Sequence, residues 1–314
     1  MSTTTTPPFP LPPNSYPHPI YNNQFQHLLI YNAPKESSPH VIFVALNRPQ
    51  KRNAIHAPMW VEIHKAFTTL GTNGDDIRCI ILLGIGKAFC AGIDFTDSAF
   101  GLQDMNNNNN DESEADVARR AMSFYPQIKQ MQHAFTSLET SCTLPIIAAM
   151  HGYCVGAGVD LACCTDIRYC SDESLFSIRE VKLGLAADIG TLQRLPKLIG
   201  HSSFLKELCY TGNDFDAVDA CRIGFVSQVE PSVPSLISKA MDVANEISNV
   251  SPVAVVGTKK SLLYSRDHAV EEGLDHVALM NMSGLMTDDL MRSLLKKGGD
   301  EDVRFEPLLR HSRL

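Results

Sequence analysis

Short apolar runs alternate with longer amphipathic segments along the first two thirds of the chain. Each run is rich in β-branched or other apolar residues and ends at a polar or glycine-containing turn, which is typical of a buried strand. The predicted strands span residues 41–46, 77–83, 145–150, 166–170 and 175–177. The helices predicted between them, from apolar residues at helical spacing, span residues 58–70, 117–138 and 159–164. Alternating strands and helices predict an α/β core with crossover connections.

The last third of the chain has a different pattern, in which helical periodicity dominates. Successive helices are predicted at 218–225, 233–247, 252–264 and 268–295. We therefore expect three parts: a leader over 1–20, a core over 21–225 and a helical C-terminal subdomain over 226–314. The Thr- and Pro-rich leader is expected to be disordered. Inside the core, the asparagine-rich segment 104–116 is expected to be a surface loop, because it has almost nothing apolar to bury.

Composition limits the possible functions. The chain of 314 residues carries 27 basic and 35 acidic side chains, a net charge of −8, and no basic stripe. This charge disfavours a nucleic-acid partner. No apolar run is long enough for a membrane span. The nine cysteines follow no disulfide or Cys-x-x-Cys pattern, which indicates reduced thiols inside the cell.

The sequence ends at Ser312-Arg313-Leu314. A small residue, a basic residue and leucine resemble the Ser-Lys-Leu peroxisomal address. The alternative is a chance triplet. We expect delivery to the peroxisome through the import receptor that reads such tripeptides.

Two glycine-containing turns follow predicted strands and are candidates for chemistry. The first is Lys87-Ala-Phe-Cys-Ala-Gly-Ile-Asp94, and the second is His151-Gly-Tyr-Cys-Val-Gly-Ala-Gly-Val-Asp160. Glycine lets a ligand approach the backbone, and N–H groups from two such loops can form an oxyanion hole. Either turn alone is also explained by tight packing. Neither has the spacing of a nucleotide-phosphate loop, and no metal cluster or nucleophile elbow is present in the sequence.

Three carboxylates follow these turns: Asp160, Glu180 and Asp188. Each has a structural explanation when taken singly, as an acid at a helix start, a surface charge beside Arg179, and a helix N-cap, respectively. Asp188, however, lies in an apolar stretch, where a charge is costly. Carboxylates in such surroundings have raised pKa values and can hold or release a proton near neutrality. His151 is interpreted as a hydrogen-bonded structural residue.

Three spaced segments together resemble the enoyl-CoA hydratase/isomerase (crotonase) superfamily. They are Leu46-Asn-Arg-Pro-Gln-Lys-Arg-Asn-Ala54, the Lys87 to Asp94 turn, and the run that ends at Asp160. The resemblance implies an α/β fold, a spiral of repeated ββα units, with a helical C-terminal region that assembles trimers or hexamers. It also implies an acyl-CoA substrate, no metal, and no cofactor besides the coenzyme A of the substrate.

Within the superfamily, the chain is most similar to the Δ3,5-Δ2,4-dienoyl-CoA isomerases of fatty acid β-oxidation. Asp160, the run from Glu180 to Pro196 that includes Asp188, and the segments at 251–257 and 264–268 carry this likeness. The resemblance implies that Glu180 removes the α-proton, that Asp188 protonates the distal carbon, and that Asp160 orients the site. Enoyl-CoA hydratases differ, because they have glutamate at the position of Asp160 and lack the Asp188 match.

The resemblance further implies an oxyanion hole formed by the N–H groups of Ile93 and Ala157. Ala157 stands where the family usually has glycine, a change that keeps the N–H and narrows the pocket. The residues implied for substrate binding are Lys51, Arg52, Ala54, Ala91, Gly92, Ile93, Asp94, Phe95 and Ala157. The coenzyme A nucleotide is expected beside Lys51, Arg52 and Ala54. The alternatives are an enoyl-CoA hydratase, a Δ3-Δ2-enoyl-CoA isomerase, and a non-catalytic binding protein of the same fold.

Overall fold

The computed structural model describes residues 8–35, 37–72, 75–96, 117–297 and 304–308. Its larger sheet has seven strands in the order β1-β2-β3-β4-β5-β7-β10. These strands are β1 (Tyr16–Pro17), β2 (Leu28–Asn32), β3 (Val41–Leu46), β4 (Cys79–Gly84), β5 (Ile146–Met150), β7 (Ile167–Ser171) and β10 (Gln228–Glu230). From β3 to β10 all neighbours are parallel, whereas β1 and β2 join antiparallel at one edge.

A second, three-stranded sheet lies beside the first in the order β6-β8-β9. It consists of β6 (Tyr153–Val155), β8 (Leu175–Ser177) and β9 (Asp214–Asp216). A strand of the large sheet is followed by a strand of the small sheet and then by a helix, twice in succession: β5-β6-α3 and β7-β8-α4. This repeat is the ββα spiral that the sequence resemblance implies.

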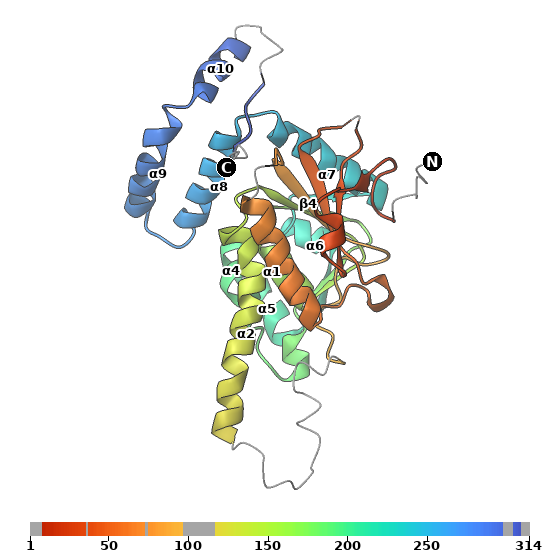
Figure 1. Cartoon of the computed structure of the whole chain (residues 1–314). Coiled ribbons are helices and arrows are strands. Elements are labelled where there is room, and N and C mark those ends of the chain that lie inside the picture. The colour runs from red at the N-terminus through yellow and green to blue at the C-terminus, as the bar shows by residue number, and fades with distance from the viewer. Residues whose placement is uncertain (1–7, 36, 73–74, 97–116, 298–303, 309–314) are drawn as a thin grey trace.

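The helices surround these sheets (Figure 1). They are α1 (Ala57–Thr72), α2 (Val117–Thr140), α3 (Ala157–Cys163), α4 (Thr191–Leu198), α5 (Ser202–Thr211), α6 (Ala217–Arg222), α7 (Val233–Ser248), α8 (Pro252–Ser265), α9 (Val270–Gly284) and α10 (Asp288–Lys297). Three short 3-10 helices, η1 (Asn22–Gln24), η2 (Pro49–Lys51) and η4 (Glu180–Leu183), complete the described elements. Ser232 and Ser251 accept hydrogen bonds from the first turns of α7 and α8, each of which has a proline at its first or second position, so local sequence fixes both starts.

The large sheet is buried on both faces because alternate residues of its strands enter two separate apolar cores. Ile42, Val44 and Leu46 of β3 face the core that contains α1, α2 and the small sheet. Val41, Phe43 and Ala45 face the core that α7 closes. Near-continuous apolar runs are what a doubly covered parallel strand requires. The predicted strands are confirmed for this reason.

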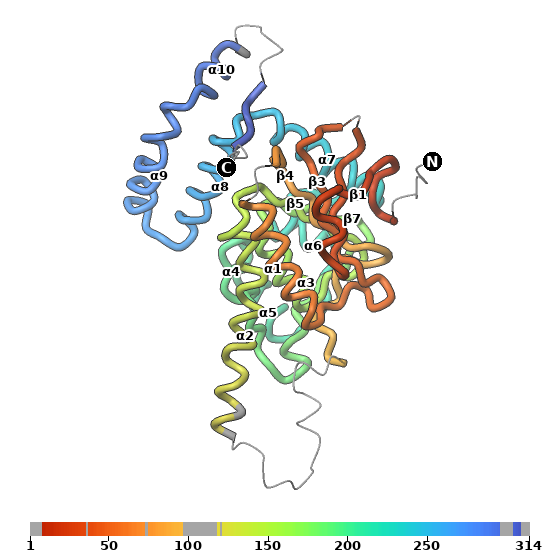
Figure 2. The backbone as a smooth tube through the Cα atoms, viewed as in Figure 1, coloured from red at the N-terminus to blue at the C-terminus, as the bar shows by residue number. Residues whose placement is uncertain are grey.

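The C-terminal half differs from the prediction in two respects. The helix expected over 268–295 is divided into α9 and α10, because the chain turns at 285–287 and the Thr287 hydroxyl accepts a hydrogen bond from the Asp289 N–H at the new helix start. The boundary expected at 225/226 also lies too early. β10 pairs with β7, and α7 covers the sheet, so both belong to the core. The extension proper is α8 to α10. α8 lies against the core, where Lys259 donates to the carbonyls of Leu138 and Leu144, and α9 and α10 stand away from the core in Figure 2.

The leader expected to be disordered over 1–20 is packed along its described part, residues 8–20. Leu11 is buried in the core that α7 closes, and β1 pairs with β2. The prediction is wrong for this segment, because a few apolar side chains suffice to hold it against the sheet edge. Residues 1–7 lie outside the described part of the chain, as does the asparagine-rich segment 104–116.

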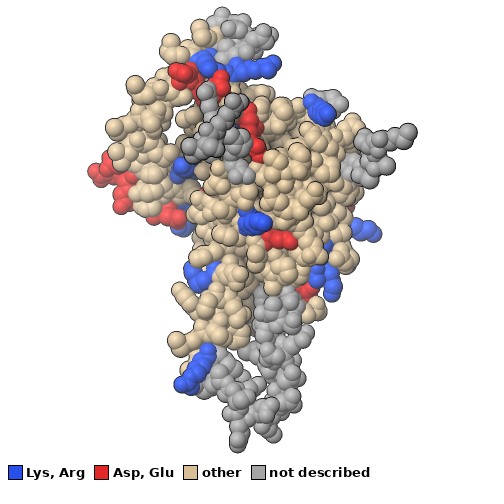
Figure 3. Space-filling model, viewed as in Figure 1, with Lys and Arg blue, Asp and Glu red and all other residues tan. Residues whose placement is uncertain are grey.

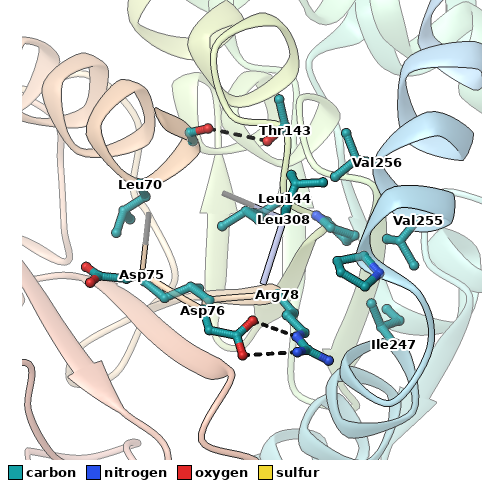
Figure 4. A pocket seen from close by; sticks show the side chains of 14 residues that line it. Leu70, Asp75, Asp76, Arg78, Thr143, Leu144, Ile247, Val255, Val256 and Leu308 are labelled. Atoms are coloured by element: carbon teal, nitrogen blue, oxygen red, sulfur yellow. Dashed lines mark hydrogen bonds and ion pairs between the residues drawn. The ribbon is translucent and has the colours of Figure 1, made fainter. Parts of the chain in front are cut away.

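The returning C-terminal segment 304–308 is held at the end of the sheet opposite the glycine turns. Arg78 donates to the carbonyl oxygens of Ser248 and Phe305, at 3.0 and 2.8 Å, and to the Asp76 carboxylate. Leu308 and residues before β4 and β5 line a pocket there (Figure 4). In parallel sheets ligands bind at the carboxyl ends of the strands. This pocket, at the amino ends, is therefore a packing feature.

The surface agrees with the charge balance of the sequence. On the face shown in Figure 3, the blue Lys and Arg side chains lie scattered over the described atoms instead of forming one patch. Among the described residues, no helix has both the length and the apolar character needed to cross a membrane.

Candidate active site

The first glycine turn follows β4 and is held from one side by the backbone. Gly92 has φ +101°, a conformation that side chains rarely adopt. The Ile55 N–H donates to the Gly92 carbonyl at 2.8 Å, and the Asp94 N–H donates to the Ile55 carbonyl at 2.9 Å. These two bonds fix Ile93 between them.

The second glycine turn joins β6 to α3 and lies against the first. The Val155 N–H donates to the Cys90 carbonyl at 2.9 Å, and the Cys90 N–H donates to the Tyr153 carbonyl at 3.0 Å. Gly156 follows with φ +52°. A Cβ placed on Gly156 would stand 3.9 Å from the Gly92 Cα. The two turns therefore meet at their glycines.

Two backbone amides lie at this meeting point, those of Ile93 and Ala157. Among the residues that the structure describes, no acceptor bonds the N–H of Ile93 or of Ala157. A Cβ on Gly92 would lie 3.9 Å from the Ala157 nitrogen, so the two amides come from adjoining positions. Paired free amides of this kind suit a carbonyl oxygen that gains negative charge.

Glu180 lies directly on the second turn. It begins η4, and its Oε1 is 3.0 Å from the position of a Cβ on Gly156. A side chain at residue 156 would press on this carboxylate and would also be strained by the φ of +52°. Its Oε2 is buried and has no hydrogen-bond partner within the described part of the chain. Burial, followed by the charge of Asp188, raises the pKa of Glu180. Within the described part of the chain, the site thus holds a carboxylate oxygen without a hydrogen-bond partner beside two amides without an acceptor.

Asp160 is the buried member of the trio. It lies in α3 with 1% of its surface exposed, and its Oδ1 accepts the Thr191 N–H at 2.6 Å. The carboxylate therefore supports the start of α4 as well as lying in the first turn of α3. Burial is the main cause that raises its pKa to about 7, and the charges of Glu180 and Asp188 contribute in the same direction.

Asp188 lies at the rim, in the turn before α4. Its side chain is exposed, and its carbonyl oxygen accepts the Gln132 amide at 2.7 Å. Partial burial raises its pKa. The structural alternative, an N-cap, does not hold, because Gly190 is the N-cap residue of α4 and no side chain caps it. Asp188 influences the pKa values of both other acids, so the structure brings the three carboxylates together.

The residues implied for substrate binding divide into exposed and buried groups. Lys51, Arg52 and Phe95 are exposed, and the Arg52 guanidinium lies 5.0 Å from the centre of the Tyr153 ring. Ala54, Ala91 and Ile93 are half-buried, whereas Gly92, Asp94 and Ala157 are buried. The exposed cations lie where phosphate groups can reach them.

Asp94 has a different environment from the other predicted binding residues. Its carboxylate is buried, pairs with Arg48 at 2.6 Å and accepts hydrogen bonds from Thr96. These hydrogen bonds, with the Thr96 hydroxyl first, lower the pKa of Asp94 to about 2. Because Arg48 also donates to the Ala54 carbonyl at 3.0 Å, Asp94 anchors the first turn to the 48–54 loop.

Two supporting residues were not predicted from the sequence. Arg48 is one, and the other is Asn53, which is fully buried and donates its amide to the carbonyls of Ile85 and Ala88. Nothing in a polar turn segment distinguishes such a residue from a surface one. The interpretation of His151 as structural agrees with its contact to the Gly86 carbonyl at 2.9 Å and with burial, which lowers its pKa.

This arrangement can stabilise an oxyanion and move protons beside it. Two free amides face a carboxylate with a raised pKa, and two further acids lie within electrostatic reach. Such groups serve enolate chemistry, in which a base takes the proton next to a polarised carbonyl. In the described part of the chain, no group of three or more His, Cys, Asp or Glu side chains could hold a metal ion.

Comparison with known proteins agrees with this geometry. Residues 36–296 match the enoyl-CoA hydratase/isomerase family. The chain therefore belongs to that family. The crystal structure of an enoyl-CoA hydratase from Bacillus anthracis superposes with a TM-score of 0.76 at 26% identity, covering 89% of this chain and 99% of that one.

Two curated relatives carry a more specific name. The mitochondrial Δ(3,5)-Δ(2,4)-dienoyl-CoA isomerase of Rattus norvegicus is 40% identical over 295 residues, which is 93% of this chain and 86% of that protein. The peroxisomal Δ(3,5)-Δ(2,4)-dienoyl-CoA isomerase of Arabidopsis thaliana is 40% identical over 275 residues, 87% of this chain and 95% of that protein.

Proposed function

We propose that this protein is a Δ3,5-Δ2,4-dienoyl-CoA isomerase that converts 3,5-dienoyl-CoA to 2,4-dienoyl-CoA in fatty acid β-oxidation. The observation that carries the proposal is the carboxylate of Glu180 against Gly156, beside two further acids and two amides that have no acceptor among the described residues. Relatives with this activity in their names span nearly the whole chain at 40% identity. The proposed reaction needs no cofactor beyond the coenzyme A of the substrate.

The proposed mechanism transfers one proton at each end of the diene. The thioester oxygen accepts hydrogen bonds from the Ile93 and Ala157 amides, which makes the C2 proton acidic. Glu180 removes that proton, the electron pairs shift along the dienolate, and Asp188 gives its proton to C6. Glu180 is then protonated and Asp188 ionised, and proton exchange with water restores both.

The environments of the acids support this division of roles. Partial burial raises the pKa of Asp188 above its ordinary value, which is the direction that a proton donor requires. A raised pKa also makes ionised Glu180 a stronger base. Asp160, which is buried and hydrogen-bonded at the start of α4, orients the carboxylates without reaching the substrate.

The remaining binding residues complete the proposed site. In this proposal, Lys51 and Arg52 bind the phosphates of coenzyme A beside Ala54. The turn of Ala91, Gly92 and Phe95 lies along the acyl thioester, and Asp94 holds that turn in place.

Mixing the purified protein with 3,5-dienoyl-CoA tests the proposal. The conjugated 2,4-dienoyl product should appear as an increase in ultraviolet absorbance. Crotonyl-CoA hydration without diene isomerisation would instead indicate an enoyl-CoA hydratase, and conversion of 3-enoyl-CoA alone would indicate a Δ3-Δ2-enoyl-CoA isomerase. Binding without turnover would indicate a non-catalytic protein.

Asp188→Asn tests the assignment of the distal acid. The variant should lose isomerase turnover by roughly 10²-fold, because the proton donor is removed. The assignment fails if Asp188→Asn keeps full turnover while Asp160→Asn and Glu180→Gln do not.

We also propose that the chain forms homo-trimers or hexamers through its helical extension. Large apolar side chains on α9, on α10 and in the turn between them are exposed in the single chain, namely Leu274, Leu279, Met282, Leu285, Met286, Met291 and Leu294. Leaving so much apolar surface in water is unfavourable. Light scattering should give a mass of a trimer or a hexamer of the 34.6 kDa chain; a monomer would contradict this proposal.

Peroxisomal delivery is the proposed localisation. It draws on Ser312-Arg313-Leu314, which lies outside the described residues, and on the peroxisomal name of the Arabidopsis relative. The rat relative is named mitochondrial, so the two compartments are the alternatives. A fluorescent fusion at the N-terminus should enter peroxisomes, and deletion of Leu314 should abolish import. Unchanged import after the deletion would contradict the tripeptide's role.

A further inference from the structure

The turn that carries Asp188 is held by a side chain from the next helix. Arg194, in α4, folds back over this turn, and its Nη1 lies 1.9 Å from where a Cβ on Gly190 would be. Gly190 has φ +137°. The guanidinium thus occupies the space that a side chain at residue 190 would need.

One face of α2 binds both this turn and Arg194. Gln132, Thr136 and Glu139 are spaced four and three residues apart, so they share a face of the helix. Gln132 donates to the Asp188 carbonyl at 2.7 Å. Thr136 accepts from Arg194 at 3.0 Å, and Glu139 accepts from its Nε and Nη2 at 2.9 and 2.7 Å.

The ion pair between Arg194 and Glu139 is largely buried and restricts the motion of both side chains. The side chains are 11% and 6% exposed, and both guanidinium bonds go to one carboxylate oxygen, Oε2. The other oxygen, Oε1, is taken by Arg266 at the end of α8. A planar guanidinium with several bonds has little freedom to rotate. The arginine is therefore a stiff support.

The start of α4 also connects this support to the buried acid. The Thr191 N–H binds Asp160, while Asp188 precedes it by three residues in the same turn. A shift of the first turn of α4 would move Asp188 relative to Glu180, whose place against Gly156 depends on a different segment. Support of Asp188 is thus separable from support of Glu180.

We propose that Arg194, fixed by Glu139 and assisted by Gln132, is a positioning residue that sets Asp188 for proton delivery to C6. This inference rests on the proposed isomerase function. Arg194 exchanges no proton itself: Glu180 takes the C2 proton, and Asp188 supplies the proton that forms the new C6–H bond. Loss of the Arg194 side chain should slow the proton transfer from Asp188 to C6 and leave the rate of proton removal from C2 unchanged.

Deuterium exchange separates the two transfers. In heavy water, deuterium enters C2 of unreacted 3,5-dienoyl-CoA whenever the dienolate forms and is reprotonated at C2, and mass spectrometry measures this alongside product absorbance. For Arg194→Gln we expect a fall in kcat of about tenfold to 10²-fold, with KM changed less than about threefold. The C2 exchange rate should stay near the wild-type value, so the ratio of exchange to product rises.

Gln132→Leu provides a second variant that leaves the buried ion pair intact. It removes the bond to the Asp188 carbonyl, together with the bond that Gln132 accepts from Lys129 within α2, and should raise the same ratio by a smaller factor. This variant keeps the test decisive where Arg194→Gln folds poorly. Arg222→Gln is the matched control, because Arg222 pairs with Asp219 on the surface of α6, and both rates should remain unchanged.

The outcomes distinguish this inference from the proposed function. Equal loss of exchange and product in Arg194→Gln and Gln132→Leu would show a merely structural role and overturn the inference. Unchanged product formation in both variants would overturn it as well. A wild-type protein that forms no 2,4-dienoyl product would instead overturn the proposed function.

Discussion

The two walls of the site are supported in different ways. The amide wall, residues 91–94 and 155–157, is held by backbone hydrogen bonds to Ile55 and Cys90. The carboxylate wall, residues 180–190, is half exposed and is held by side chains, among them Gln132 and Arg194. Backbone hydrogen bonds, together with the ion pair of Asp94 and Arg48, fix the oxyanion position. Because side chains support the acids, substitution of a supporting residue can move them. The positions of the acids decide which protons are transferred, so the carboxylate wall sets the reaction type.

Glu180→Gln should have the largest effect on turnover. It changes the carboxylate wall and leaves the amide wall as it is. The amide keeps the shape against Gly156 but cannot accept the C2 proton, so kcat should fall by roughly 10³-fold. The binding of a non-reactive acyl-CoA, measured by calorimetry, should change little, because the amide wall is intact. Glu207→Gln, on the exposed face of α5, is the matched control. Normal turnover in Glu180→Gln would remove this residue from its role.

Gly156→Ala should have the next largest effect, because it changes the contact between the walls. The new Cβ would lie 3.0 Å from Glu180 Oε1 at a backbone φ of +52°. Displacement of the carboxylate and strain at the Ala157 amide should lower kcat by about 10²-fold. In Gly200→Ala, the control, the added Cβ has no neighbour within 4 Å. Equal rates for the two variants would refute the close fit.

Asp160→Asn should have the smallest effect, which is a change in how the free energy of unfolding depends on pH. The folded state holds the Asp160 proton up to pH about 7, whereas the unfolded chain releases it near 3.8, so stability falls as pH rises between these values. The full difference corresponds to roughly 4 kcal/mol, and relaxation of the site leaves about 2 kcal/mol.

Asn carries no charge, and its side-chain oxygen can still accept the hydrogen bond from the Thr191 N–H. The gain in stability of Asp160→Asn over the wild type should therefore grow by about 2 kcal/mol from pH 4.5 to pH 8. Denaturant unfolding at both pH values measures the change, with exposed Asp242→Asn as control. An advantage that does not vary with pH would mean that Asp160 is ionised at low pH in the fold.

The sequence predicted the elements whose patterns are local. β3 was found at its observed bounds, and α7 and α8 within one residue at each end, because buried strands and capped helices are marked by adjacent residues. β2 and α5 were not predicted. The division of the last helix depends on a short turn at 285–287, which apolar periodicity alone does not mark.

For the site, the sequence by itself determined the chemical groups: two glycine turns and three carboxylates in a fixed order. Only the tertiary structure decided which contacts they make. It brought Gly92 to Gly156 through strands far apart in the chain, put Glu180 where a Cβ on Gly156 would crowd it, and buried Asp160 against Thr191. The reason is physical, since desolvation and hydrogen bonding that shift a pKa arise from neighbours in space. The residue type fixes which proton a side chain can accept or donate, and its neighbours in the fold fix the pKa at which it does so.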